Sequence, residues 1–83
     1  MGVGPSFELV TRSGCHLCDV MEAELLPLLA DHGIQLGLRD VDHDADLLER
    51  FGEVVPVLLR DGRPVAKVRL KRGQAERLIH RRR

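Results

Sequence analysis

Two cysteines are the residues of this sequence best suited to chemistry. Cys15 and Cys18 are the only cysteines in the chain, and His16 and Leu17 separate them. In a reducing compartment, so close a pair indicates redox or metal chemistry more than a structural crosslink. The pair also opens a predicted helix inside a strand–helix–strand pattern. A bare C-x-x-C spacing is weak evidence, but in this context it indicates thiol–disulfide exchange.

The start of a helix makes the two thiols unequal. It carries about half a positive elementary charge and unpaired N–H groups, so a thiolate there is stabilised and the thiol pKa falls below its free value of about 8.5. We expect Cys15 to be exposed and to act as the nucleophile. Cys18 lies one turn later, on an apolar stripe with Met21 and Leu25. We expect it to be more buried and to resolve the mixed disulfide formed on Cys15.

Three neighbours could modulate this chemistry. A protonated His16 would favour the Cys15 thiolate, and the alternative is a solvated histidine of small effect. Leu17 offers apolar surface to a substrate chain, or packs within its helix. Arg12, just before the turn, could hold a carboxylate or steady the thiolate, and the alternative is a solvated arginine at a strand end.

Hydrophobic periodicity predicts the elements that position the motif. Strands are predicted at 7–11, 34–38, 54–59 and 65–70, and helices at about 15–30, from 42 or 44 to 52, and 73–81. The order β-α-β-α-β-β-α combines a parallel βαβ unit with an antiparallel hairpin around Asp61-Gly62. We therefore expect an α/β fold with a four-stranded mixed sheet and helices on both faces.

Several positions within these elements carry specific expectations. Pro27 should kink the first helix, and Gly33 suits a left-handed residue just after its end. An aspartate should cap the second helix and Gly52 should close it. Leucines and a phenylalanine of that helix should point inward, as should three residues of the last helix: Leu47, Leu48 and Phe51, then Ala75, Leu78 and Ile79.

Composition limits the classes of function. The 83 residues suit one domain over 1–83, with a flexible start at 1–6 and a basic tail at 81–83. Thirteen basic residues balance thirteen acidic ones, and two Phe are the only aromatics, so neither nucleic acid nor anionic membrane is an expected partner. No apolar run approaches the roughly 20 residues of a membrane span, and no signal peptide is recognisable. We expect a cytoplasmic protein.

Two segments resemble glutaredoxins. The run LVTRSGCHLC at 9–18 resembles their first strand and active-site turn, and Val54-Val55-Pro56, with the strand and Asp-Gly turn that follow, resembles their cis-proline segment. Taken alone, Pro56 would suit the start of an edge strand with a trans bond. The resemblance is closest to small bacterial glutaredoxin-like proteins with a Cys-His-x-Cys motif. It implies a thioredoxin-like fold and a cis Val55–Pro56 bond facing Cys15, with the Val55 backbone pairing with a substrate or glutathione main chain.

The sequence departs from that family at three places. His16-Leu17 replaces the usual Pro-Tyr, and Val10 stands where a tyrosine is expected. The stretch 70–74 lacks a clear Gly-Gly followed by an acidic residue, although Gly73 supplies part of it. The resemblance still implies a dithiol oxidoreductase acting on protein disulfides or glutathionylated thiols, and we expect a monomer with no cofactor. Glutathione as co-substrate, a thioredoxin-type partner and a dedicated partner all stay open as the source of electrons. The alternative is a redox-sensing binding module without turnover.

Metal binding is the remaining alternative. Zinc needs four ligands, and Cys15, Cys18 and His16 supply at most three, so a zinc site or an iron–sulfur cluster would have to be shared between chains. The alternating aspartates at 40–46 suggest calcium, but an EF-hand beginning at Asp40 would need Gly and Glu where Ala45 and Phe51 stand. A strand end followed by a helix cap accounts for them better, and we expect no metal.

Overall fold

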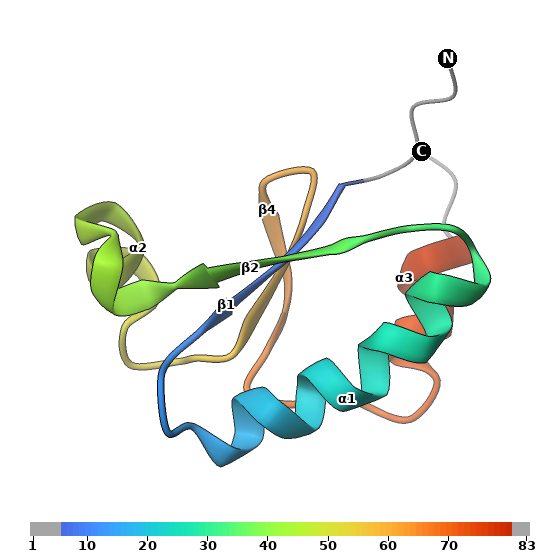
Figure 1. The fold of residues 1–83 in the computed structure, drawn as a ribbon, viewed down its shortest axis with the longest axis horizontal. Coiled ribbons are helices and arrows are strands. Elements are labelled where there is room, and N and C mark those ends of the chain that lie inside the picture. The colour runs from blue at the N-terminus through green and yellow to red at the C-terminus, as the bar shows by residue number, and fades with distance from the viewer. Residues whose placement is uncertain (1–5, 81–83) are drawn as a thin grey trace.

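A computed structural model of the chain describes residues 6–80 and contains a four-stranded mixed sheet with helices on both faces (Figure 1). Its elements are β1 (Phe7–Thr11), α1 (His16–Asp31), β2 (Leu36–Asp40), a short 3-10 helix η1 (Val41–His43), α2 (Ala45–Phe51), β3 (Val57–Arg60), β4 (Arg63–Lys67) and α3 (Gln74–His80). This confirms the expected order and fold class. The start and basic tail expected at 1–6 and 81–83 fall largely or wholly outside the described residues.

The sheet has the order β2-β1-β3-β4. β1 pairs parallel with β2 and antiparallel with β3, and β3 pairs antiparallel with β4. The carboxyl end of β1 therefore lies beside the amino end of β3. This brings the segment after Thr11 and the segment before Val57 to one end of the sheet. None of the described helices combines the length and apolar character needed to span a bilayer.

Alternation along the strands divides the core into two apolar clusters. Phe7 and Leu9 face α1 and α3, whereas Val10 faces α2. The α1-side cluster contains Phe7, Leu9, Met21, Leu25, Leu29, Leu58, Ala66, Ala75, Leu78 and Ile79. The α2-side cluster contains Val10, Val41, Leu47, Phe51, Val57 and Leu59. Each cluster holds one of the two phenylalanines, and aliphatic side chains build most of the rest.

The end of α1 explains why β2 starts later than the sequence predicts. Gly33 is left-handed, with φ +68°, and its N–H donates to the carbonyl of Ala30 at 3.0 Å. The N–H of Ile34 donates to the carbonyl of Leu29 at 2.9 Å. These bonds form a Schellman motif, which uses Ile34 to close the helix rather than to pair in the sheet. The strand predicted at 34–38 therefore occupies Leu36–Asp40.

The short helix α2 exposes one leucine that the sequence places in the core. Asp44 caps the helix by accepting hydrogen bonds from the N–H groups of Asp46 and Leu47. Leu47 and Phe51, four residues apart, are buried as expected, but Leu48 is 44% exposed. A residue one position round a helix turns about 100° away, and this seven-residue helix buries a narrow stripe. The expectation for Leu48 is therefore wrong.

The hairpin and α3 agree with the sequence more closely. Asp61 and Gly62 both have positive φ, +53° and +84°, as a tight hairpin turn requires. The helix α1 continues past Pro27 to Asp31. The three residues expected to anchor the last helix are buried: Ala75, Leu78 and Ile79.

The strand β4 ends earlier than predicted. It stops at Lys67 instead of running to residue 70, because Val68 adopts a left-handed conformation with φ +69°. The N–H of Val68 donates to the carbonyl of Pro56 at 2.7 Å, and the N–H of Arg69 donates to the carbonyl of Lys67 at 2.7 Å. A β-branched residue rarely takes this conformation, so the hydrogen bonds hold Val68 against its local preference.

Candidate active site

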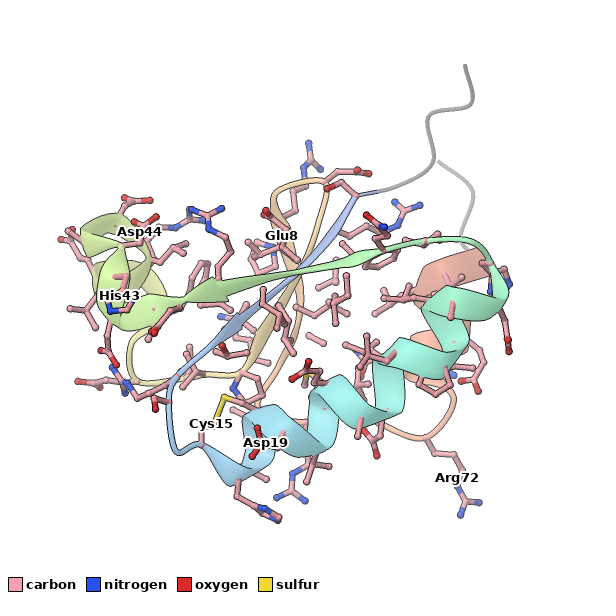
Figure 2. The ribbon with its side chains drawn as sticks, in the orientation of Figure 1. Glu8, Cys15, Asp19, His43, Asp44 and Arg72 are labelled. Atoms are coloured by element: carbon pink, nitrogen blue, oxygen red, sulfur yellow. A yellow bond between two sulfur atoms is a disulfide. The ribbon has the colours of Figure 1, made fainter. Side chains whose placement is uncertain are left out.

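The turn after β1 places Cys15 at the N-cap of α1. Gly14, with φ +75°, allows the chain to reverse, and the N–H of Cys15 donates to the carbonyl of Arg12 at 3.3 Å. The Sγ atom of Cys15 accepts a hydrogen bond from the N–H of Cys18 at 3.1 Å. The two sulfur atoms form a disulfide, with their Cα atoms 5.2 Å apart (Figure 2). One of the N–H groups of the first turn of α1, that of Cys18, thus points at the sulfur of Cys15.

The two cysteines differ in accessibility. Cys15 is half-buried at the surface, whereas Cys18 is 2% exposed and packs among core residues. An incoming sulfur atom can therefore reach Cys15 but not Cys18. Among residues 6–79, no charged side chain is buried, so no buried carboxylate there stands behind Cys18 to take its proton.

The segment before β3 lies at the same end of the sheet as the dithiol. Val10 pairs with Val57, so continuing the antiparallel register places Pro56 opposite Thr11, where the chain turns toward the cysteines. The Val55–Pro56 peptide bond is cis. Because β3 is an inner strand, the alternative of an edge strand beginning with a trans proline is wrong.

Arg12 joins the active-site turn to the α2 side of the molecule. Its Nε and Nη2 atoms donate to the two carboxylate oxygens of Asp42 at 3.0 Å each, and its Nη1 atom donates to the carbonyl of Gly52 at 2.9 Å. Hydrogen bonding to Arg12 lowers the pKa of Asp42 below its ordinary value, and the same contact raises the pKa of Arg12. Arg12 holds a carboxylate, as the sequence suggested, but a carboxylate of its own chain.

The backbone around position 52 leaves no room for a side chain, so only glycine fits there. A Cβ atom built at this position would lie 2.5 Å from the carbonyl oxygen of Leu48. Gly52 lies one helical turn after Leu48, at the end of α2, and its carbonyl accepts the hydrogen bond from Arg12.

The residues between the cysteines differ in environment. His16 begins α1 and is exposed. Leu17 is half-buried and lines a hollow of about 170 Å³ with Val68 and Leu70, between α1 and the segment that follows β4. Leu17 thus contributes to an apolar surface one residue from Cys18.

A second arginine organises the α2 side. Arg39 donates from Nη2 to Asp44 at 2.9 Å and from Nη1 to Glu8 at 3.5 Å. The pKa of Asp44 lies below its ordinary value, first because the N–H of Leu47 donates to it and second because Arg39 lies beside it. The aspartates at 40–46 therefore cap helices and pair with arginines. Among residues 6–80, no group of three or more acidic, histidine or cysteine side chains is placed to hold a metal ion.

Sequence reasoning missed four residues around the site. Asp42 and Gly52 were assigned only to helix boundaries, and no spacing rule connects either to Arg12. Nothing in the sequence marks Val68 as left-handed. Gln74 accepts a hydrogen bond from the N–H of Lys71 at 2.9 Å and donates one to the carbonyl of Val65 at 3.3 Å. Such contacts depend on the folded arrangement of distant segments.

Comparisons with known proteins agree with this geometry. Residues 6–80 match the family described as glutaredoxin-like domain (DUF836). Uncharacterized proteins of Mycobacterium tuberculosis and Mycobacterium bovis are 38% identical over 64 residues, which cover 71% of this chain and 66%, just under two thirds, of theirs.

Solved structures show the same fold. A protein of Nitrosomonas europaea is 22% identical, with a TM-score of 0.79 over 95% of both chains. Thioredoxin-2 of the malaria parasite is 21% identical, with a TM-score of 0.62 over 95% of this chain and 81% of its own. At these identities the likeness extends to the fold alone.

Proposed function

Because the chain belongs to the glutaredoxin-like domain family, we propose that it is a thiol–disulfide oxidoreductase that works through Cys15 and Cys18. The observation that carries this proposal is the inequality of the two cysteines. Cys15 lies at the N-cap of α1 and accepts a hydrogen bond at its sulfur atom, whereas Cys18 is buried one turn later. In the reduced protein, we expect the helix N-terminus to stabilise the Cys15 thiolate.

The reaction follows from this arrangement. The Cys15 thiolate attacks one sulfur of a substrate disulfide, and the second substrate sulfur leaves as a thiolate. Cys18 then loses its proton to water or to the departing thiolate and attacks the Cys15 sulfur. The substrate is released with both sulfurs reduced, and Cys15 and Cys18 are left as a disulfide after the loss of two electrons. A thiol reductant such as glutathione must restore the dithiol.

The surroundings of Cys15 support a substrate chain bound across this end of the sheet. The Val55 backbone precedes the cis bond and lies at the level of the active-site turn, where it could pair with a substrate main chain. Leu17 offers apolar surface to the same chain. Protein disulfides or glutathionylated thiols in a reducing cytoplasm are the substrates that this proposal names.

The test is a redox titration with two cysteine variants. The protein is equilibrated in glutathione buffers, and both cysteines are followed by alkylation and mass spectrometry. We expect a reversible Cys15–Cys18 disulfide in the wild type and a stable glutathione adduct on Cys15 in the Cys18→Ser variant. Cys15→Ser should lose all exchange activity. If no exchange occurs at any potential while Cys15→Ser still binds a partner, the chain is a redox-fold binding module.

A further inference from the structure

The stretch 67–72, which is the last residue of β4 and the segment after it, is rich in positive charge. Four of its six residues are basic and exposed: Lys67, Arg69, Lys71 and Arg72. Within residues 6–80, none of these four side chains makes an ion pair. We call residues 67–72 the basic segment. Figure 2 shows Arg72 extending away from the helices and the sheet.

Other arginines of the described residues form ion pairs. Arg12 pairs with Asp42, Arg39 pairs with Glu8 and Asp44, and Arg50 pairs with Asp46. The whole chain balances thirteen basic residues with thirteen acidic ones. Glu24 and Glu76 line a hollow with Lys71 and Arg72, but within residues 6–80 no ion pair neutralises the positive charge of the basic segment.

A hollow on the outer side of β4 brings three of these cations together. It has a volume of about 350 Å³ and is lined by Lys67, Arg69 and Lys71, with Gln74 and residues 64–66. No carboxylate contributes to its lining. On the other side of the segment, the hollow beside α1 is mostly apolar, although Glu24 and Arg69 also line it. An extended chain would thus meet cations on one side and apolar surface on the other.

The start of the basic segment is fixed next to the active site. The N–H of Val68 donates to the carbonyl of Pro56, the residue that precedes β3 at the dithiol end of the sheet. At the other end of the segment, the side chain of Gln74 bonds both the N–H of Lys71 and the carbonyl of Val65. A surface held at both ends loses little conformational entropy when a partner binds.

We propose that the basic segment docks acidic residues that flank the reactive cysteine of a protein substrate. The inference deepens the proposed function and rests on it, because the docked segment is the one whose disulfide Cys15 attacks. Charge attraction would raise the rate at which acidic substrates meet the dithiol and would weaken with added salt. Basic substrates would be disfavoured by the same field.

The test compares three peptide disulfides that differ only in their flanking residues, which are glutamates, serines or lysines. Reduced protein is mixed with each peptide at low and at high salt, and initial rates are measured by chromatography of quenched samples. At low salt we expect the glutamate peptide to react about ten-fold faster than the lysine peptide, and we expect salt to shrink that difference.

Charge-reversal variants locate the effect. Arg69→Glu should remove most of the preference for the glutamate peptide, and the double variant Arg69→Glu/Lys71→Glu should reverse it. The matched control is Arg63→Glu, an exposed arginine at the far end of β4, which should keep the wild-type preference. Equal rates for all three peptides would overturn the proposal, and so would an Arg63→Glu effect as large as that of Arg69→Glu.

Two further measurements separate the possible failures. An uncharged disulfide, bis(2-hydroxyethyl) disulfide, should be reduced equally by the wild type and the double variant. If the wild type does not reduce even this reagent, the proposed function fails. Docking is then tested separately, by fluorescence anisotropy of a labelled glutamate peptide without cysteine that is mixed with the Cys15→Ser/Cys18→Ser protein. Absence of that binding overturns the docking proposal. It is also overturned if the double variant loses as much activity on glutathione disulfide as on the glutamate peptide, since a small anion would then explain the surface.

Discussion

The two faces of the sheet are held together by different forces. On the α1 side, ten buried residues from three strands and two helices form one apolar cluster. On the α2 side, six buried residues form a smaller cluster, and side-chain hydrogen bonds of Arg12, Arg39 and Asp44 join the surrounding segments. The dithiol sits on the helix of the first side, whereas Arg12 ties the turn before it to the second.

This difference indicates how each half of the site should respond to a disturbance. Apolar packing depends weakly on pH and salt, so the position of Cys18 should be robust. Ion pairs at the surface are screened by salt and lost when their carboxylates are protonated. The link between the active-site turn and α2 should therefore weaken in acid or in high salt before the core does.

The largest effect is expected in the α1-side cluster. Leu25 is 1% exposed, and Leu25→Ala should lower the free energy of unfolding by about 3 kcal/mol, because it removes buried apolar contacts and leaves a cavity. Its neighbour Leu26 is 45% exposed, so Leu26→Ala should change stability by less than about 0.5 kcal/mol. Urea unfolding of the oxidised protein measures both. Similar losses for the two variants would show that α1 does not pack as described.

A smaller loss is expected from the link between Arg12 and Asp42. Arg12→Gln removes the bidentate ion pair and weakens the contact with the Gly52 carbonyl, so stability and exchange rate should both fall. The stability difference from the wild type should shrink in high salt, because the pair is exposed to solvent. Urea unfolding at low and high salt tests this. A salt-independent loss would show that Arg12 acts through packing alone.

Acid should weaken the α2 side in a defined direction. The pKa values of Asp42 and Asp44 are lower in the folded chain than the ordinary value of about 3.9, so the unfolded chain binds protons more readily. The stability that these groups add is present at neutral pH and is lost as the pH falls below about 4. Thermal unfolding across this range should show the loss, and Asp44→Asn should make the curve flatter. If the pH dependence of thermal stability is the same in Asp44→Asn as in the wild type, groups other than Asp44 cause the acid sensitivity.

The smallest effect is expected at Val68. Val68→Gly relieves an unfavourable left-handed backbone, but it adds conformational entropy to the unfolded chain and removes a side chain that lines the hollow beside α1. These terms oppose one another, so the change should stay below about 1 kcal/mol. Val65→Gly, at a half-buried position of β4 without positive φ, lacks the compensating relief and should be clearly more destabilising. Equal losses in calorimetry would mean that Val68 stores no strain.

Most of the fold could be predicted because it rests on local signals. The period of apolar residues indicates α1, the Asp61-Gly62 pair specifies the hairpin, and Gly33 marks the end of α1. Leu48 was misplaced because α2 buries only a narrow stripe, and the two errors in strand bounds occurred where two segments compete for one residue. Ile34 is apolar enough for a strand, but its N–H closes α1. Val68 fits the alternation of β4, but its N–H bonds to Pro56 from another segment.

The candidate site likewise combines features that local sequence predicts with contacts between distant segments that it does not predict. The positions of Cys15 and Cys18 at the start of a helix follow from their spacing and context, and the cis bond before Pro56 was implied by the resemblance. The partners of Arg12 were not predictable, since Asp42 and Gly52 are thirty and forty residues away along the chain. Contacts of that kind are decided by the sheet register and not by any pattern in the sequence.

The crowded backbone at Gly52 has a consequence for how the chain tolerates sequence change. Gly14, Gly33 and Gly62 adopt positive φ but have open space around them, so asparagine or aspartate can replace them at moderate cost. Gly52 has an ordinary φ, yet even a methyl group would collide with the Leu48 carbonyl. In a saturation mutagenesis library selected for folding, position 52 should therefore be the most restricted of these four glycines. A survey of backbone angles alone would rank it the most permissive.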